Sequence, residues 1–374
     1  MRYYIIAGEA SGDLHASRLI RAIRKNDQQA VFRAWGGDLM QEEGADVVKH
    51  YRDLAFMGFV EVLFNLKTIL ANMRFCKADM LAFKPDAVIF VDYPGFNIPM
   101  AKFAKEHQLK TIYYISPQVW AWKENRVKTI RKVVDKMLVI LPFEKRFYQK
   151  WNYETNYVGH PLIEIIDGFK SANDVEKIRH EIGIEQDKKI IALLPGSRTQ
   201  EIKKKLPIML AATKYFKEYV FVVAQASALS DELIHSYTSS FPNVRIMKGE
   251  TYKLLSIADA ALVTSGTATL ETALFGVPEV VCYKGSPITF AIGKHLVKVP
   301  YIALVNLIMN KKVVDELIQD ELNPENIKKS LEKIINQGEA RETMMTEYKE
   351  LYSNLKLGGA ASENAAKIID EFLQ

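Results

Sequence analysis

The sequence predicts an α/β protein with two domains, each built around a parallel β-sheet. Short, continuously apolar runs alternate with segments of helical pattern, which is typical of strands buried on both faces of a parallel sheet. The 374 residues suffice for two domains of similar size. An apolar run followed by a glycine-containing turn opens the chain and recurs from residue 189, so we expect two Rossmann-like domains facing a central cleft.

Eight short runs carry the strand prediction, and each is apolar at nearly every position. A polar, helix-like segment at 163–189 separates the first four from the last four. We therefore predict domains at 1–165 and 166–350, with C-terminal helices at 351–374 that either cross back to the first domain or exchange with a second chain. The eight runs lie at 3–7, 87–91, 111–115, 137–141, 189–194, 219–224, 260–264 and 279–283.

Composition and charge narrow the class of protein. The hydrophobic content of 48% and charged content of 25% are those of a soluble globular protein and exclude a disordered chain. The net charge of +5 suits phosphorylated ligands or an anionic membrane surface and is too small to indicate nucleic-acid binding. Cys76 and Cys282 cannot build a disulfide framework, which favours a reducing compartment. The N-terminus does not resemble a secretory signal, because acidic Glu9 follows only a short apolar run. We therefore predict a cytoplasmic protein.

The first run leads into the segment 8–13 (GEASGD). Its glycines allow a tight turn that presents backbone N–H groups at a helix N-terminus, where an anionic or polyhydroxylated ligand can bind. The pattern is not G-x-G-x-x-G, so a dinucleotide site is poorly supported. A plain strand-to-helix turn capped by Ser11 or Asp13 is an equally good interpretation.

Asp92 directly follows the run 87–91. The carboxyl end of a parallel strand is where α/β proteins place their chemistry, and the Pro94-Gly95 turn would hold the carboxylate there. A general base needs such a position. The alternative is an Asp that only accepts hydrogen bonds from turn amides, which is a common use of Asp in loops.

Two tryptophans are concentrated in the segment 116–123 (SPQVWAWK). Trp120 and Trp122, together with Gln118 and Lys123, are suited to stacking on a sugar or to contacting an acyl chain. A hydrophobic plug between the domains explains the same tryptophans and is the more common use of this residue.

The second half of the chain repeats the pattern with cationic and hydroxyl residues. Gly196 permits close backbone approach, and Arg198 at the end of the run 189–194 can bind a diphosphate through a bidentate fork. We interpret the lysines at 203–205 as a solvated helix face. The later segment 265–273 (SGTATLETA) places Gly266 between hydroxyl residues at a helix start, which favours a nucleotide site over a merely capped helix.

No metal-binding motif is present in the sequence. It contains no D-x-D, no H-E-x-x-H and no Walker A pattern, so Arg198, backbone amides and helix dipoles would have to meet phosphate charge. Asn306, in the apolar segment 300–308, lies either in the cleft or in a core segment.

Taken together, the motifs resemble those of bacterial lipid-A-disaccharide synthases. The resemblance implies an inverting glycosyltransferase of the B-type (GT-B) fold that transfers 2,3-diacylglucosamine from its UDP donor to the 6-hydroxyl of 2,3-diacylglucosamine 1-phosphate. The products would be the β-1,6-linked disaccharide and UDP. The matching segments are collinear and lie at 8–13, 57–62 (MGFVEV), 116–122, 141–144 (LPFE), 194–198 and 265–271.

The resemblance also implies a role for each matching residue and no metal cofactor. Asp92 would be the base, and the acceptor would lie near Glu9, Ser11, Asp13, Gln118 and Trp120. UDP would be held by Arg198, Ser265, Gly266, Thr267, Glu271 and Asn306. The chain departs from the family at Gly95, where a second Asp is frequent, and at Val305, where Pro is frequent; the second departure puts the role of Asn306 in doubt.

The apolar segment 56–76 is interrupted by charged residues and is too polar to span a bilayer. The resemblance implies that this segment docks on the inner leaflet and admits acyl chains. An ordinary core helix is the alternative, and we expect a mixed role, partly core and partly exposed. The residues expected to contact lipid are Met57, Phe59, Val62, Leu63 and Phe64. We therefore predict peripheral association with the inner membrane, while the sequence leaves a homodimer open.

Two other classes of protein stay open at this point. One is another UDP-sugar glycosyltransferase or an epimerase of the same fold, and the other is a non-catalytic protein that binds a UDP-sugar or lipid. An unpaired carboxylate at Asp92 favours an enzyme over a binding protein.

Overall fold

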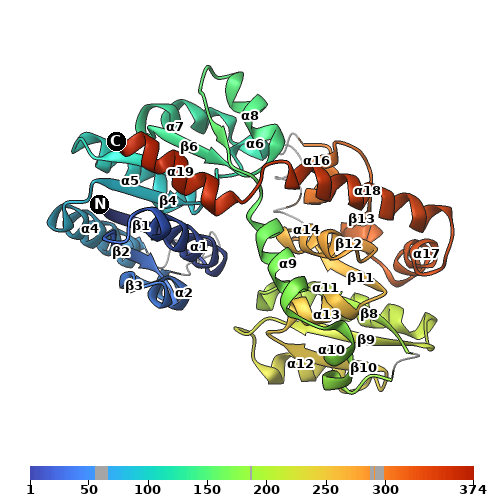
Figure 1. Ribbon diagram of the computed structural model, residues 1–374. Coiled ribbons are helices and arrows are strands. Elements are labelled where there is room, and N and C mark those ends of the chain that lie inside the picture. The colour runs from blue at the N-terminus through green and yellow to red at the C-terminus, as the bar shows by residue number, and fades with distance from the viewer. Residues whose placement is uncertain (55–65, 186–187, 287–289, 291–298) are drawn as a thin grey trace. The chain divides into compact units, whose positions relative to one another are not determined.

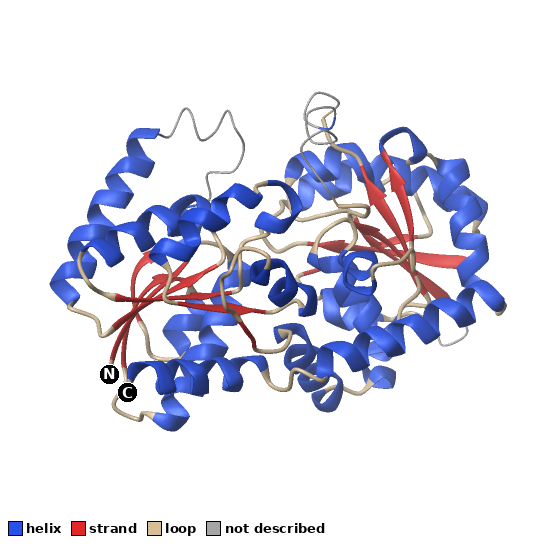
Figure 2. Ribbon diagram, turned by 90° about the horizontal axis from the view of Figure 1, so that it is seen from above, coloured by secondary structure: helices blue, strands red, loops and turns tan. Residues whose placement is uncertain are grey.

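The computed structural model describes residues 1–54, 66–185, 188–286, 290 and 299–374. They divide into two compact units, one formed by Met1–Pro161 with Leu355–Gln374 and the other by Leu162–Asn354. Each unit contains one parallel sheet with helices on both faces (Figure 2). The prediction of two parallel-sheet α/β domains is confirmed. The five predicted lipid contacts, Met57, Phe59, Val62, Leu63 and Phe64, lie outside the described residues.

The first unit holds a seven-stranded sheet with the order β3-β2-β1-β4-β5-β6-β7. The chain winds outward from β1 to β3, then returns to the other side of β1 with β4, so the direction of winding changes between β1 and β4. The strands are β1 (Arg2–Ala7), β2 (Val31–Gly36), β3 (Asp46–His50), β4 (Ala87–Val91), β5 (Lys110–Tyr114), β6 (Lys136–Val139) and β7 (Asn156–Tyr157).

The helices of this unit form two layers because its central strands are apolar on both sides. Side chains such as Ile5 pack with α1 and α19 in one core, and side chains such as Ile6 pack with α4, α5 and α7 in the other. The helices are α1 (Ala10–Asn26), α2 (Asp38–Glu42), η1 (Tyr51–Leu54), α4 (Leu66–Phe83), α5 (Pro94–Glu106), α6 (Val119–Trp122), η2 (Glu124–Arg126), α7 (Val127–Val133), α8 (Pro142–Gln149) and α19 (Ala361–Leu373).

The last helix, α19, belongs to this first unit although it is the end of the chain (Figure 1). It packs beside α1, where Lys25 Nζ lies 2.6 Å from Glu363 Oε1. Asn364 Nδ2 donates to the carbonyl oxygen of Val158 at 3.0 Å. The C-terminal segment therefore completes the layer of helices over one face of the first sheet.

The second unit has a six-stranded sheet with the order β10-β9-β8-β11-β12-β13, which repeats the winding of the first. Its strands are β8 (Lys189–Leu194), β9 (Tyr219–Gln225), β10 (Val244–Lys248), β11 (Ala260–Thr264), β12 (Glu279–Tyr283) and β13 (Asp315–Ile318). Its helices are α9 (Pro161–Ala172), α10 (Val175–Ile182), α11 (Thr199–Ala212), η3 (Thr213–Tyr215), α12 (Asp231–Thr238), α13 (Thr251–Ile257), α14 (Thr267–Phe275), α16 (Leu304–Met309), η4 (Gln319–Glu321), α17 (Pro324–Ile335) and α18 (Glu339–Lys356).

No helix among the described residues has both the length and the apolar character that a membrane span requires.

Candidate functional site

The four motifs lie at the same place in both sheets. In the first unit, the segment 8–13 follows β1 and Asp92 follows β4, which are the two strands where the winding changes direction. In the second unit, the segment 195–198 follows β8 and Ser265 follows β11, the corresponding pair. Open α/β sheets bind ligands at the carboxyl ends of such strand pairs. The topology therefore gives each unit one candidate half-site.

Asp92 stands in an unusual backbone conformation. Its φ of 42° and the φ of 48° at Tyr93 place two consecutive non-glycine residues in the left-handed region, at a cost of roughly 1–3 kcal/mol each. The carbonyl oxygen of Asp92 accepts hydrogen bonds from Asn97 Nδ2 at 2.7 Å and from the Tyr113 hydroxyl at 2.6 Å. These two buried side chains hold the strained turn between β4 and α5 and so fix the direction of the carboxylate.

The carboxyl group of Asp92 has a strongly altered acidity. Burial, and to a smaller extent the negative charge of Glu9, raises its pKa to about 7. A bond from the backbone of Tyr93 opposes the shift and is the weakest of the three influences. A carboxylate used only to accept turn amides would have a lowered pKa. The value near 7 is instead the one at which a general base works best near neutral pH.

Gly8 is required at the end of β1 because the ring of Tyr93 lies against it. A Cβ at this position would stand 2.2 Å from Tyr93 Cδ1. Glu9, which precedes α1, is partly exposed, and Ser11 in the first turn of that helix is exposed. Of these two side chains, Glu9 is close enough to Asp92 for its charge to act on that carboxyl group.

Asp13 does not offer its carboxylate to a ligand, contrary to the acceptor-side contact that we predicted. The side chain is 2% exposed, and its two oxygens accept from the backbone N–H groups of Gly37, Leu39 and Met40 at 2.8–3.1 Å. These are the first amides of α2, which otherwise lack partners inside their own helix. Asp13 is therefore a positioning residue that ties α2 to the start of α1.

Trp120 is likewise a core residue, and its predicted stacking on the acceptor is wrong. Its ring is 6% exposed and packs edge-on against Phe143 with the centroids 4.9 Å apart. The indole Nε1 donates to Glu144 Oε1 at 3.2 Å, and burial raises the pKa of Glu144 to about 7. The ring is therefore buried within the first unit. Gln118, two residues earlier, is exposed.

The turn after β8 is shaped by Gly196 and Glu201. Gly196 has a φ of 121°, and a Cβ there would meet Glu201 Oε2 at 2.4 Å, so only glycine fits. The same oxygen accepts a hydrogen bond from the backbone N–H of Ser197 at 3.1 Å. Arg198 follows as the exposed N-cap residue of α11. The turn thus presents a guanidinium at a helix N-terminus.

Lys205 is buried, so our interpretation of the lysine run 203–205 as a solvated face is wrong at this position. Lys203 is exposed, whereas Lys205 is 2% exposed. Its ammonium group donates to Glu201 Oε1 at 3.2 Å and to the hydroxyl of Thr264 at the end of β11. Burial lowers the pKa of Lys205, and Glu201 opposes that shift. Lys205 therefore links the turn after β8 to the turn after β11.

The turn after β11 leads directly into α14. Ser265 donates its hydroxyl to the carbonyl oxygen of Ile302 at 3.0 Å, while Gly266 and Thr267 are exposed at the N-terminus of the helix. Glu271, in the second turn, accepts from the hydroxyl of Tyr252 at 2.7 Å, and burial raises its pKa. The positive end of the helix dipole and an oriented carboxyl group thus lie on one helix.

Asn306, predicted to contact UDP, has its amide group fully used in hydrogen bonds inside the protein. Its Nδ2 donates to Val314 O at 3.0 Å and to Glu316 Oε1 at 2.9 Å, and its Oδ1 accepts from the N–H groups of Val313 and Val314. Glu316 in turn accepts from the N–H of Ile302. Asn306 therefore supports the loop on which Ser265 rests, and its amide group is engaged by these internal bonds.

Five residues that support the site were absent from the sequence-based set. They share a buried or half-buried position and a bond to a predicted site residue or to its turn, and they are Asn97, Tyr113, Glu144, Lys205 and Tyr252. Among the described residues, no group of three or more His, Cys, Asp or Glu side chains is arranged to hold a metal ion.

Solved structures with the same fold bind UDP-sugars or transfer sugars. The UDP-GlcNAc 2-epimerase of Neisseria meningitidis, bound to UDP-GlcNAc, aligns with a TM-score of 0.68 and 15% identity over 100% of this chain and 99% of its own. The glycosyltransferase of kitacinnamycin aligns with a TM-score of 0.65 and 13% identity over 100% and 99%. The fold is thus that of GT-B glycosyltransferases and UDP-GlcNAc 2-epimerases.

Sequence comparison identifies the family. The model of the lipid-A-disaccharide synthetase family matches residues 3–369. The lipid-A-disaccharide synthase of Syntrophus aciditrophicus is 40% identical over 367 residues, which are 96% of this chain and 95% of that protein. That of Coxiella burnetii is 37% identical over 373 residues, covering 99% and 98%. The chain belongs to the lipid-A-disaccharide synthase family, a family of UDP-sugar glycosyltransferases, and the resemblance that its motifs carry is confirmed.

Proposed function

We propose that this chain transfers 2,3-diacylglucosamine from UDP-2,3-diacylglucosamine to the 6-hydroxyl of 2,3-diacylglucosamine 1-phosphate, with inversion at the anomeric carbon. The family supports the substrates. The observation that carries the chemistry is Asp92, a carboxylate held at the end of β4 with a pKa of about 7. One base and one stabilised leaving group are what a single in-line displacement requires.

The acceptor half of the reaction belongs to the first unit. The Asp92 carboxylate removes the proton of the acceptor 6-hydroxyl while that oxygen forms its bond to C1 of the donor sugar. The C1–O bond to the β-phosphate breaks at the same time, and its electron pair leaves with UDP. Glu9 keeps Asp92 basic because a second negative charge nearby disfavours the ionised form of the pair. Ser11 and Gln118 are the exposed polar side chains available to the acceptor sugar.

The donor half belongs to the second unit. The charge that develops on the diphosphate falls on Arg198 and on the N-terminus of α14 at Ser265, Gly266 and Thr267. Glu271, oriented by Tyr252, accepts hydrogen bonds from the ribose hydroxyls. We propose that no metal ion takes part, since a guanidinium, backbone amides and a helix dipole supply the stabilisation that a divalent cation provides elsewhere.

The substrates carry acyl chains, so we place the reaction on the cytoplasmic face of the inner membrane. The described part of the segment 56–76 and the rest of α4 support this placement, because α4 exposes three large apolar side chains. They are Leu70, Phe75 and Leu81, with exposed fractions of 50%, 47% and 39%. An apolar surface of this kind suits a peripheral contact with lipid.

The test is to incubate the purified chain with both lipid substrates in mixed micelles and to follow UDP release and disaccharide formation, with and without EDTA. We expect stoichiometric formation of UDP and the β-1,6-linked disaccharide, unchanged by EDTA. UDP release that does not need the acceptor, or epimerised UDP-sugar as the product, would contradict the proposed transfer. Loss of activity in EDTA that Mg²⁺ restores would contradict only the metal-free mechanism.

A further inference from the structure

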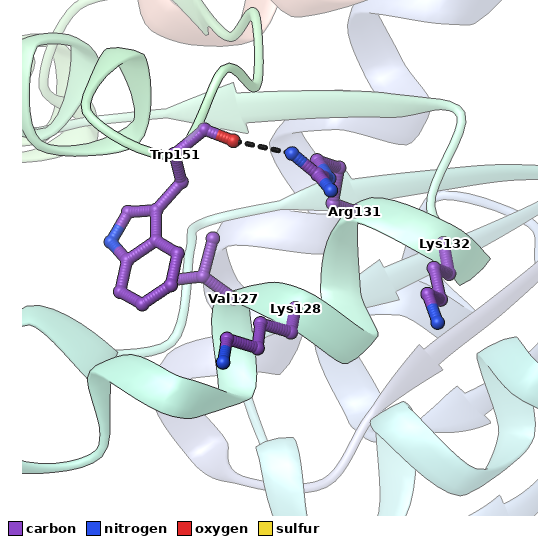
Figure 3. Close-up of a pocket in the computed structure, with 5 residues that line it drawn as sticks. All are labelled: Val127, Lys128, Arg131, Lys132 and Trp151. Carbon is purple, nitrogen blue, oxygen red and sulfur yellow. Dashed lines mark hydrogen bonds between the residues drawn. The ribbon is translucent and has the colours of Figure 1, made fainter.

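A hollow with a basic rim lies at α7, and none of the residues that line it is assigned to the reaction. Its volume is about 260 Å³, and it is lined by Val127, Lys128, Arg131, Lys132 and Trp151 (Figure 3). Val127 is buried beneath it, while Lys128, Arg131 and Lys132 are exposed. The hollow, which we call the α7 groove, thus combines an apolar floor with three cations.

One cation of the α7 groove is held in place by a hydrogen bond, and the two lysines are available for a ligand. Arg131 Nη1 donates to the carbonyl oxygen of Trp151 at 2.7 Å, which fixes the guanidinium beside the main chain of Trp151 (Figure 3). Within the described part of the chain, neither Lys128 nor Lys132 has an ion-pair partner. Both are strongly hydrated point charges on flexible stems, which suits them to a mobile anion such as a phosphate group.

Positive charge is concentrated around this groove. The segment 123–151 contains nine Lys or Arg and three Asp or Glu, whereas the net charge of the whole chain is only +5. Of the three acids, Glu144 is buried and Asp135 pairs with Lys105. This part of the surface attracts anions far more strongly than the composition indicates.

An exposed tryptophan stands just before α7. Trp122 is 45% exposed, and its ring is covered by Lys123 Nζ at 4.0 Å and by the guanidinium of Arg126 at 5.7 Å. Tryptophan flanked by cations is typical of protein surfaces at the boundary between lipid and water, where the ring is apolar and its N–H is polar. The aromatic and the basic side chains here point to the same kind of partner.

The α7 groove lies on the helical layer that also holds α4. Val127 and Ile130 of α7 share one core with Cys76 and Met80 of α4, over the same face of the sheet. The exposed apolar side chains of α4 and the cations of α7 therefore belong to one layer of the first unit. A bilayer offers both complements, acyl chains and anionic headgroups.

We propose that the α7 groove binds the phosphate of anionic glycerophospholipids and docks the first unit on the bilayer. This inference rests on the proposed function, because it takes the substrates to be membrane lipids. It goes further by assigning a headgroup site that is separate from the acceptor and donor sites. The apolar side chains of α4 supply a contact that does not depend on salt, and the α7 groove supplies a salt-dependent preference for anionic lipid.

The test compares Lys128→Glu/Lys132→Glu with a matched control, Lys329→Glu/Lys349→Glu, which changes the charge equally at two exposed lysines of α17 and α18. The full-length proteins are co-sedimented with phosphatidylcholine vesicles that contain or lack phosphatidylglycerol. We expect the α7 variant to bind anionic vesicles at least about 30-fold more weakly, because each cation near such a surface contributes a factor of about five. The control should bind like the wild type.

Three readouts decide the result. Equal binding of the α7 variant and the wild type to anionic vesicles would overturn the proposal, and so would an equal loss in the control. Inorganic phosphate that binds the free protein tightly through Lys128 and Lys132, without a bilayer, would assign the groove to a soluble anion and also overturn it. Activity on substrates in micelles should be unchanged in the α7 variant, and a folded variant that is active there separates this test from that of the proposed function.

Discussion

The two units share one design and differ in the charged side chains that they place at the same strand ends. Each has a parallel sheet that changes winding direction beside its first strand, and each places two motifs at the carboxyl ends of that strand pair. The first unit presents carboxylates there, Glu9 and Asp92, whereas the second presents Arg198 and the buried ammonium of Lys205. The topology thus determines where a site lies, and the side chains determine whether it accepts a proton or stabilises a phosphate.

The supports of the two sites also differ in kind. In the first unit, neutral side chains, Asn97 and Tyr113, hold a strained turn so that burial can raise the pKa of Asp92. In the second unit, Lys205 pairs with Glu201 of its own helix and donates to Thr264 at the end of β11, so a charged side chain links the two turns. A base must be kept only weakly stabilised in its charged form, while a phosphate site is helped by nearby charge.

The largest effect is expected for Asp92→Asn, which removes the carboxylate that distinguishes the first unit. Removal of the base should lower turnover by about 10²–10⁴-fold. The affinity for UDP should hardly change, because we place the UDP site on the other unit. Turnover and the Kd of UDP are measured on the same preparation. Turnover within a factor of a few of the wild type would exclude Asp92 as the base.

The next largest effect is expected at Arg198→Ala. A charge-assisted hydrogen bond to phosphate is worth about 1.5–3 kcal/mol, so the Kd of UDP should rise by about 10–150-fold. Calorimetric titration with UDP measures it. If the affinity is unchanged, the guanidinium points away from the diphosphate, and the assignment of Arg198 to the phosphate site of the second unit is wrong.

Lys205→Gln should have a smaller effect on UDP, by way of the two turns that the lysine connects. We expect the Kd of UDP to rise about tenfold and the free energy of unfolding to fall by about 1–3 kcal/mol, since a buried polar partner is lost. The matched control is Lys203→Gln on the exposed side of the same helix, which should alter neither. A loss of stability without any change in UDP affinity would show that Lys205 serves the fold alone.

Glu9→Gln tests, through the pH profile of activity, whether the charge of Glu9 acts on Asp92 in the first unit. Asp92 must be ionised to act, so the activity of the wild type should fall as the pH drops below about 7. Without the charge of Glu9 the pKa of Asp92 is lower, and the acid limb of kcat/KM should move to lower pH. An acid limb that stays in place would mean that Glu9 does not act on Asp92.

The smallest expected effect concerns stability. The carboxyl of Asp92 has a pKa of about 7 in the folded state and an ordinary value of 3.8 when unfolded, so ionisation costs stability as the pH rises through 7 and costs none below about 4. Asp92→Asn should therefore have a higher Tm than the wild type at pH 8, and this advantage should shrink toward pH 4. Thermal melts across this range test the sign of the Tm difference. If the fold stabilised the carboxylate, Asp92→Asn would have the lower Tm at pH 8.

Much of the fold could be predicted from the sequence because its central strands are apolar on both faces. The five strands without a predicted run are β2, β3, β7, β10 and β13. β2 carries Arg33, which pairs with Asp79 and Asp46, and β7 has two residues. β3, β10 and β13 are only partly buried. Such strands lack the continuous apolar run on which the prediction depended.

The site could be predicted less completely, because sequence position does not show where a polar side chain finds its partners. Asp13, Trp120 and Asn306 lie in the motifs, yet their bonds go to α2, Glu144 and the loop before β13. A signal for Lys205 was present, since it shares a helix face with the buried Ile202 and Met209 at helical spacing. The predicted placement of Asp92 at a strand end rested on topology alone and agrees with the structure.

The most direct test of Asp92 as the base is a site-resolved NMR titration of its carboxyl carbon, assigned by its absence in Asp92→Asn. The titration should show an apparent pKa near 7 in the wild type and a lower one in Glu9→Gln. A pKa near 4 in both proteins would mean that Asp92 is an ordinary turn residue, and the assignment of proton transfer to the first unit would be wrong.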